Sequence, residues 1–386
     1  MTIQSKNRHL NICLDISPMI HRKAGLGSYV SNLARQLLAI DSNNNYSLFH
    51  YGSQTPALVP SELNSLPRKQ VPCGARRWRL TVAARHLSGL NMDQSFKGVD
   101  VFHATEHLLP PFGTIRTVFT FHDAIYALFP QYHLPLNRLF LGLMMPRFLR
   151  QANAIIAVSE CSKRDAMRLY SVDPARIHVI YEGVDPAFRP LDDSNELARV
   201  REKYGLPPRF ILYFSTIEPR KNLKTLLDAF NTLLTRDRTI PDLVIAGRKG
   251  WLYEPVFAQV RLLGLESRVH FTDWVAPEDA PGLVNAAGLF AYPSLYEGFG
   301  LAPLEAMACG TPVICSNAAS LPEVVGDAAI LIDPRDVGGL AGALERVLSD
   351  SALSHELRAK GIAQAAKFSW ERTARETLRV YESIDN

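Results

Sequence analysis

Residues 289–316 read LFAYPSLYEGFGLAPLEAMACGTPVICS, and this stretch sets the pattern for the rest of the chain. The apolar runs at its two ends predict strands. Between them, Pro303 suits the first turn of a helix and Gly310 suits the cap at a helix C-terminus. We therefore predict a strand, a glycine-containing loop, a helix over 302–309 and a second strand.

The same alternation of short apolar runs and longer helix-period segments, such as 221–234, extends along all 386 residues. One set of predicted strands is 11–16, 46–51, 101–104, 117–123, 154–159 and 177–181. A second set is 210–216, 242–246, 269–272, 289–293, 312–316 and 329–333. Such alternation is typical of parallel sheets covered by helices on both faces. We predict an α/β protein of two Rossmann-like, doubly wound domains that face a central cleft.

The connector between the two sets of strands reads DPAFRPLDD, residues 185–193. Its two prolines and its acidic residues favour an extended linker over a helix or a strand. We place the hinge here, with the first domain ending at residue 187 and the second running from 188 to 369.

The composition excludes several classes of protein. The net charge of +4 is small and Lys and Arg form no long runs, so we expect no nucleic-acid partner. The five cysteines form no CxxC pair, which favours a reducing, cytoplasmic location without a structural metal. We see no secretory signal. The longest apolar run, 139–149, is too short to cross a bilayer.

The loop before the predicted helix at 302–309 carries the chemistry. Gly298 and Gly300 let the backbone approach a ligand, and free N–H groups at a helix start attract phosphate. Glu297 in the loop and Glu305, predicted in the first helical turn, lie on either side of this anion site, so we expect them to accept hydrogen bonds from sugar hydroxyls. The alternative is a capping Glu and a surface Glu.

Arg220 and Lys221 follow the first strand of the second set, at the start of a predicted helix. Arg can bind two phosphate oxygens and Lys supplies a point charge, so the pair can offset a diphosphate. Such a pair is more often a solvated surface feature. Its place after a strand, in the same domain as the Glu297 loop, favours the binding role.

Two further motifs lie after strands of the first domain. Gly25-Leu26-Gly27 follows the first strand and precedes a helix predicted over 29–40. These glycines suit a phosphate-facing turn or a close strand–helix approach. His122 ends the strand at 117–123, where it could orient a sugar hydroxyl, lend its carbonyl to developing positive charge, or be structural.

At these residues the chain resembles glycosyltransferase family 4 and, within it, the bacterial α-mannosyltransferases of polysaccharide assembly. The most specific part is Glu297, seven intervening residues and Glu305, followed by AMACGTPV and SLPEVVGD. The resemblance covers nearly the whole chain and implies the GT-B fold. The sequence departs at Ser215, where relatives often have Gly, and in the 24–27 loop, where many have adjacent glycines.

The resemblance also implies roles for single residues. Arg220 and Lys221 would hold the diphosphate, Glu305 the ribose and Glu297 the donor sugar. The backbone of Gly298, Phe299, Gly300 and Leu301 would face the sugar and phosphate, Gly25 and Gly27 would close on the phosphate, and His122 would lie beside the transferred sugar. The first domain would face the acceptor, the second would bind the donor, and residues 370–386 would return to the first domain.

We therefore expect a metal-independent, cofactor-free enzyme that transfers a sugar with retention of configuration. GDP-mannose is the donor that the resemblance favours, and the acceptor is a glycan or a lipid-linked oligosaccharide. The alternatives are a transferase with another UDP- or GDP-linked hexose, a sugar-nucleotide epimerase and a non-catalytic sugar-nucleotide sensor. A nicotinamide dehydrogenase is disfavoured, because no acidic residue clearly ends a second strand at the required spacing.

Two segments, 75–86 and 138–150, mix basic and apolar residues at helical spacing. They could rest on the anionic inner face of the plasma membrane as a peripheral contact. The equal alternative is that both are ordinary packed helices of the first domain.

Overall fold

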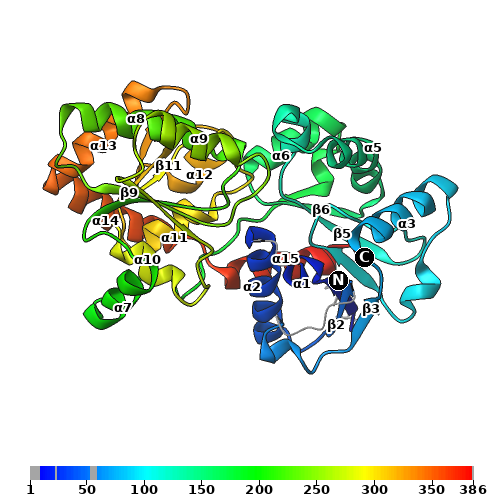
Figure 1. Cartoon of the computed structure of the whole chain (residues 1–386). Coiled ribbons are helices and arrows are strands. Elements are labelled where there is room, and N and C mark those ends of the chain that lie inside the picture. Colours follow the sequence, from blue (N-terminus) through cyan, green and yellow to red (C-terminus); the bar gives the residue numbers. More distant parts are fainter. Residues whose placement is uncertain (1–8, 22–23, 53–58, 385–386) are drawn as a thin grey trace. The chain divides into compact units, whose positions relative to one another are not determined.

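The computed structural model of the chain describes residues 9–21, 24–52 and 59–384 and divides into two compact units (Figure 1). Unit 1 comprises Met1–Ala127, Pro135–Gly183 and Trp370–Asn386, and unit 2 comprises Leu128–Leu134 and Val184–Ser369. The C-terminal segment thus lies in unit 1. The segment Leu128–Leu134 lies in unit 2 although the sequence on both sides of it belongs to unit 1.

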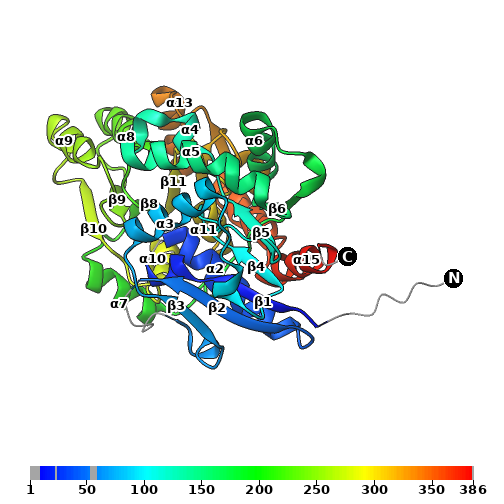
Figure 2. The same cartoon turned by 90° about the vertical axis from the view of Figure 1, so that its right-hand side faces the viewer.

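Unit 1 contains a seven-stranded parallel sheet with the order β3-β2-β1-β4-β5-β6-β7, and Figure 2 shows strands β3 to β6 side by side. Its central strands are buried along almost their whole length, as parallel sheets with two covered faces require. The strands are β1 (Asn11–Asp15), β2 (Asn45–Tyr51), β3 (Arg68–Val71), β4 (Val101–Ala104), β5 (Arg116–Phe121), β6 (Ala154–Ala157) and β7 (Ile177–Val179). All predicted strands of this unit are present. The edge strand β3 was not predicted, because its sequence RKQV lacks an apolar run.

Helices connect these strands. They are α1 (Ser17–Ile20), α2 (Ala24–Ile40), α3 (Ala75–Ser88), α4 (Ile125–Leu128), α5 (Pro135–Gln151), α6 (Glu160–Tyr170) and α15 (Trp370–Ser383), with short 3-10 turns at Ser61–Leu63, Asp93–Phe96 and Pro174–Arg176. A further 3-10 turn, Pro130–Tyr132, lies in the segment Leu128–Leu134 of unit 2. The C-terminal helix α15 packs against α2, where the Tyr29 and Trp370 rings lie 5.8 Å apart. The Tyr381 hydroxyl forms a hydrogen bond with Nδ1 of the buried His103 ring. These aromatic contacts attach the end of the chain to the first sheet.

Unit 2 contains a six-stranded parallel sheet with the order β10-β9-β8-β11-β12-β13. Its strands are β8 (Phe210–Phe214), β9 (Asp242–Ala246), β10 (Val269–Asp273), β11 (Leu289–Tyr292), β12 (Val313–Ser316) and β13 (Ile330–Ile332). Its helices are α7 (Ser194–Tyr204), α8 (Leu223–Arg236), α9 (Glu254–Leu262), α10 (Ala280–Ala286), α11 (Leu301–Ala308), α12 (Leu321–Val325), α13 (Val337–Ser349) and α14 (Ser351–Ala365), with a 3-10 turn at Pro219–Lys221. Figure 1 shows α8, α9 and α13 on one side of this sheet and α10, α11 and α14 on the other.

The carboxyl ends of the unit 2 strands lie along one edge of the sheet, because the strands are parallel. Gly247 follows β9 with φ of +133°, and a Cβ there would lie 2.0 Å from the carbonyl oxygen of Ser215. Only glycine permits this approach, which brings the loops after β8 and β9 together. Among the described residues, none of the helices combines the length and the apolarity needed to cross a membrane.

Candidate functional site

Two loops at the carboxyl edge of the unit 2 sheet carry the charged residues that the sequence singled out. One loop follows β8 and contains Arg220 and Lys221, and the other follows β11 and contains Glu297. β8 and β11 are neighbours in the sheet. The strand order reverses between them, because β9 and β10 follow on the β8 side and β12 and β13 follow on the β11 side. Open α/β sheets bind ligands at such a reversal. The fold therefore joins residues that lie 76 positions apart in the sequence.

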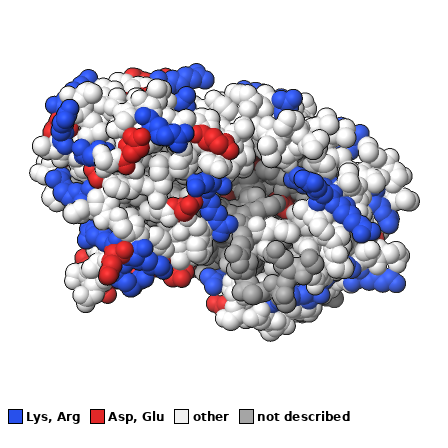
Figure 3. Space-filling view, viewed as in Figure 1, with Lys and Arg blue, Asp and Glu red and all other residues white. Residues whose placement is uncertain are grey.

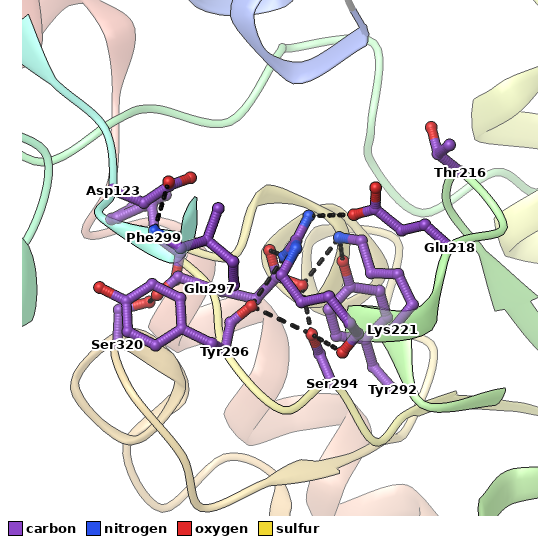
Figure 4. Close-up of polar contacts among 12 residues, drawn as sticks. Asp123, Thr216, Glu218, Lys221, Tyr292, Ser294, Tyr296, Glu297, Phe299 and Ser320 are labelled. Carbon is purple, nitrogen blue, oxygen red and sulfur yellow. Dashed lines mark hydrogen bonds and ion pairs between the residues drawn. The ribbon is translucent and has the colours of Figure 1, made fainter. Parts of the chain in front are cut away.

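The carboxylate of Glu297 lies between the two cations (Figure 4). Its Oε1 is 2.8 Å from Nζ of Lys221, and its Oε2 is 2.6 Å from Nη1 of Arg220. The hydroxyl of Ser294 donates to Oε1 at 2.6 Å. Glu297 and Lys221 are both buried. The structure thus brings together three of the predicted site residues and shows that they bind one another.

A second carboxylate completes this cluster. Oε1 of the buried Glu218 lies 2.5 Å from Nη2 of Arg220, and Lys221 donates to the hydroxyl of Tyr292. Two cations and two carboxylates give the four side chains a formal charge of zero. Such a balanced group can be buried, whereas an unpaired charge there would be costly.

The surroundings shift the pKa of both members of the central ion pair. Burial by itself would raise the pKa of the Glu297 carboxyl, but the charges of Arg220 and Lys221, with hydrogen bonds from Lys221 and Ser294, outweigh burial and lower the pKa from 4.5 to about 2. Burial, with the charge of Arg220, lowers the pKa of Lys221 although Glu297 and Glu218 oppose this. Glu297 is therefore ionised at neutral pH.

Backbone contacts fix the two loops against each other. Asn222, with φ of +58°, donates from its side chain to the carbonyl oxygen of Pro293 at 3.0 Å. Ser320 donates its hydroxyl to the carbonyl oxygens of Glu297 at 2.9 Å and of Phe299 at 2.5 Å. The backbone of the Glu297 loop is therefore held from both sides.

Helix α11 begins directly after this loop. Gly300 precedes it with φ of +121°, and Pro303 lies in its first turn as predicted. The prediction that Glu305 lies in the first turn was wrong. The helix begins at Leu301, one residue before its predicted start, so Glu305 is its fifth residue and lies in the second turn. The N–H groups of Leu301 and Ala302 have no acceptor within the helix and mark its positive end.

The Phe299 side chain is turned into unit 2. It is buried and its ring lies 5.8 Å from that of Phe368. Any contact that Phe299 makes with a ligand therefore comes from its backbone.

The prediction of a Gly25–Gly27 turn before a helix at Tyr29 was wrong. Both glycines lie inside α2, which already begins at Ala24. Packing explains the earlier start, because α2 is anchored by Tyr29 and its other buried residues against the core and α15, and this outweighs the low helix propensity of glycine. A Cβ on Gly27 would meet the carbonyl oxygen of Pro18 at 3.4 Å, and one on Gly25 would meet nothing within 4 Å.

His122 of unit 1 follows β5, and its ring is buried. Its Nε2 lies 3.0 Å from the carbonyl oxygen of Thr105, and its Nδ1 lies 3.5 Å from Oε1 of Glu182. The His122 carbonyl oxygen accepts a hydrogen bond from the hydroxyl of Ser162 at 2.8 Å. Both ring nitrogens are thus directed at protein groups, which disfavours the hypothesis that the ring orients a sugar hydroxyl.

Two further residues, which were not predicted from the sequence, lie at the same edge of the unit 2 sheet. Arg248 follows β9 and Trp274 follows β10, and the guanidinium lies 5.6 Å from the centre of the indole ring. Trp274 is 51% exposed, which is unusual for so large an apolar ring. Arg220 was predicted because it follows a strand, and the same rule applied to β9 and β10 predicts Arg248 and Trp274. Their roles, like those of Glu218 and Glu182, are proposals.

Within the described part of the chain, no group of three or more His, Cys, Asp or Glu side chains is arranged to hold a metal ion. Independence from metal nevertheless stays a prediction.

Two known families match the chain in succession. The family described as Glycosyltransferase Family 4 matches residues 24–188, and the family described as Glycosyl transferases group 1 matches residues 196–367. The first covers most of unit 1 and the second covers most of unit 2.

Relatives match the same regions. O-antigen chain mannosyltransferase B of Escherichia coli is 32% identical over 97% of this chain and 100% of its own length. Serotype-specific mannosyltransferase WbdA of Escherichia coli is 36% identical over 67% of this chain and 32% of its own length. The solved structure of sucrose-phosphate synthase from Thermosynechococcus elongatus is 22% identical, covers 97% of this chain and 99% of its own, and superposes with a TM-score of 0.76. The chain therefore belongs to glycosyltransferase family 4 and is a glycosyltransferase with the GT-B fold of two Rossmann-like domains.

Proposed function

We propose that the enzyme transfers mannose from GDP-mannose to a glycan or a lipid-linked oligosaccharide in polysaccharide biosynthesis, with retention of configuration and without a metal ion. The named mannosyltransferases among its relatives support mannose as the sugar. The observation that carries the site is the cluster of Arg220, Lys221 and Glu297 at the carboxyl ends of β8 and β11.

Arg220, Lys221 and the start of α11 bind the donor diphosphate in this proposal. Because Glu218 and Glu297 already balance the two cations, the side chains alone do not offset a diphosphate. The N–H groups of Gly298–Leu301 and the positive end of α11 supply the remaining attraction. In this proposal Gly298 places no side chain between the loop backbone and the diphosphate. Gly300 is needed for another reason, because its φ is +121° and a Cβ there would lie 2.7 Å from Cδ2 of Leu321.

Glu297 acts mainly by positioning the cations. A carboxylate offers roughly four acceptor positions, and Lys221, Arg220 and Ser294 occupy three of them. One position on Oε2 remains for a hydroxyl of the donor sugar. Glu305 in the second turn of α11 binds the ribose in this proposal.

The nucleobase lies against Trp274 and Arg248. Neighbouring strands lie about 5 Å apart, so the end of β9 is one strand and the end of β10 two strands away from the diphosphate loop after β8. A nucleoside diphosphate can cover that distance. The exposed indole offers a flat apolar surface for a purine, and Arg248 can stack or donate hydrogen bonds beside it.

The reaction is a front-side displacement at the anomeric carbon. The bond from that carbon to the diphosphate oxygen breaks, and its electron pair leaves with the diphosphate. The acceptor hydroxyl forms the new bond on the same face, and its proton passes to the departing phosphate oxygen. Arg220, Lys221 and the start of α11 stabilise the negative charge that develops on the diphosphate. In this proposal that stabilisation contributes most of the rate enhancement.

Unit 1 binds the acceptor in this proposal. Gly25 and Gly27 contribute to the binding of the donor phosphate, and His122 contributes beside the transferred sugar. His122 contributes through its backbone carbonyl in this proposal, because its ring nitrogens contact Thr105 and approach Glu182. Gly25 leaves open space beside the start of α2. We place the enzyme in the cytoplasm, with peripheral contact to the inner face of the plasma membrane.

A panel of GDP-linked and UDP-linked hexoses, incubated with the purified protein and mannose-terminated oligosaccharides, tests the proposal. We expect GDP release and an α-linked mannose in the product, measured by chromatography and by NMR of the anomeric proton. Preferential turnover of a UDP-linked sugar would assign another donor. An isomerised nucleotide sugar would indicate an epimerase, and tight binding without any product would indicate a sensor.

A further inference from the structure

Exposed leucines gather on two helices of unit 1. Among the described residues, fourteen large hydrophobic side chains are exposed, and six of them lie within the short stretches 80–90 and 136–143. Leu136 is 81% exposed, and Leu80 and Leu139 are each 69% exposed. Single exposed leucines need no explanation, but a concentration of them marks an interaction surface.

These side chains form one outward stripe on each helix. On α3, Leu80 and Leu87 are seven residues apart, so they share a face, and it lies opposite the buried Trp78 and Val82. On α5, Leu136, Leu139 and Leu143 recur at helical spacing. Arg147 and Arg150 continue the same stripe toward the end of α5.

The two helices are held together, so their stripes belong to one surface. Arg79 of α3 donates to the side chain of Asn137 on α5 at 2.7 Å, and its guanidinium lies 5.0 Å from the centre of the Phe140 ring. Further along, the rings of His86 and Phe148 lie 5.2 Å apart. We call this surface the leucine–arginine face and define it by Arg76, Arg77, Leu80, Leu87, Leu136, Leu139, Leu143, Arg147 and Arg150.

The charge of this face has one sign. Residues 71–92 and 124–159 contain no Asp or Glu, whereas Arg76, Arg77 and Arg150 are exposed. Figure 3 shows Lys and Arg side chains over the region of α3. A protein partner would have to match leucines on two helices with a shaped surface. An anionic bilayer accepts scattered leucines into its acyl region and arginines at its headgroups without such a match.

We propose that the leucine–arginine face docks the enzyme on the surface of an anionic lipid bilayer. The leucines enter the boundary between headgroups and acyl chains, and the arginines bind lipid phosphates beside them. This docking gives the enzyme access to acceptors held in a membrane. It requires no donor and no transfer activity, so it can fail or hold independently of the proposed function.

Flotation of the full-length protein with vesicles tests the docking. Vesicles of phosphatidylcholine alone are compared with vesicles of phosphatidylcholine mixed with phosphatidylglycerol. We expect the protein to float with the anionic vesicles and to remain at the bottom with the neutral ones. High salt should weaken the binding, because it screens the arginines.

Substitutions on the face separate its two contributions. Leu136→Glu with Leu139→Glu should lower the vesicle affinity by at least about tenfold, and Arg76→Ser with Arg150→Ser should lower it by about tenfold. The matched controls lie on unit 2 and should bind as the wild type: Leu262→Glu, at a leucine that is 79% exposed, and Arg209→Ser with Arg261→Ser. Thermal unfolding confirms that each variant is folded.

Three outcomes would overturn the proposal. The wild type fails to float with anionic vesicles, or the controls lose binding as much as the face variants do. Alternatively, the wild type self-associates in analytical ultracentrifugation and Leu136→Glu with Leu139→Glu abolishes the association, which would make the face an interface between copies. Transfer to a soluble acceptor, measured on the same variants, should stay unchanged.

Discussion

The ammonium of Lys221 and the carboxylate of Glu297 lie 2.8 Å apart in the interior of unit 2, although they belong to different loops. Arg220 and Ser294 bind the same carboxylate. The pair therefore links the loop after β8 to the loop that begins α11. Stability and ligand binding depend on the same side chains here, and the variants below are chosen to separate the two effects.

Lys221→Met should destabilise unit 2 strongly, because it removes one partner of a buried ion pair and leaves Glu297 undercompensated. We expect a loss of about 3–5 kcal/mol, measured by urea denaturation. Adding Glu297→Gln should cost less than the sum of the two single changes, because the stranded charge is then removed. Strictly additive effects would show that the two side chains are not coupled.

The contribution of Glu297 should depend on pH. Its pKa in the folded chain, about 2, lies below the ordinary value of 4.5, so the unfolded chain binds the proton more tightly. The stabilisation is therefore fully present above about pH 4.5 and is lost as the pH falls toward about 2, with a total on the order of 3 kcal/mol. The difference in unfolding free energy between the wild type and Glu297→Gln should shrink over this range. A difference that is constant with pH contradicts this.

Gly300→Ala should destabilise the start of α11. Its φ of +121° is unfavourable for alanine, and the new Cβ would lie 2.7 Å from Cδ2 of Leu321. We expect a loss of about 1–3 kcal/mol in chemical denaturation. Leu321→Ala removes the clash but destabilises the protein by itself, because Leu321 is buried. Gly300→Ala should therefore be compared within the Leu321→Ala background, where it should still cost part of this loss because the backbone strain remains. No loss in that background would mean that the backbone angle is unimportant.

Gly25→Ala should act in the opposite way. The position lies in α2 and a Cβ there meets nothing within 4 Å, so stability should stay the same or rise by up to about 1 kcal/mol. If the glycine faces a ligand as we propose, the transfer rate should nevertheless fall. An unchanged rate in a variant of unchanged stability would remove Gly25 from the site.

Trp274→Ala should weaken the binding of GDP by about tenfold, because stacking on the base is lost. Stability should be unaffected, since the ring is half exposed. Calorimetry with GDP and with inorganic pyrophosphate separates base from phosphate: only the affinity for GDP should change, and Trp274→Phe should restore most of it. An equal loss for both ligands would place Trp274 away from the base.

The sequence predicts elements whose own residues determine them. β11 was predicted because its sequence is a continuous apolar run. Pro303 and Gly310 predict both ends of α11 to within one residue. β3 escaped prediction because an edge strand needs no apolar run. The start of α2 was placed too late because tertiary packing outweighs the propensity of its two glycines.

The candidate site was predictable as a set of residues but not as an arrangement. Arg220, Lys221 and Glu297 were predicted as site residues because each follows a strand, and parallel strands have their carboxyl ends along one edge of the sheet. That Glu297 binds both cations depends on the pairing of β8 with β11, which no local pattern reveals. The inward direction of the His122 ring likewise depends on Thr105 and Glu182, from two other segments.

The central claim is that Arg220 and Lys221 hold the donor diphosphate at the carboxyl edge of the unit 2 sheet. Titration calorimetry of GDP into the wild type, Arg220→Ala and the exposed control Arg209→Ala tests it most directly, with thermal unfolding to verify that each protein is folded. We predict that Arg220→Ala lowers the affinity by at least about tenfold while Arg209→Ala leaves it unchanged. A folded Arg220→Ala protein that binds GDP as tightly as the wild type would contradict the claim.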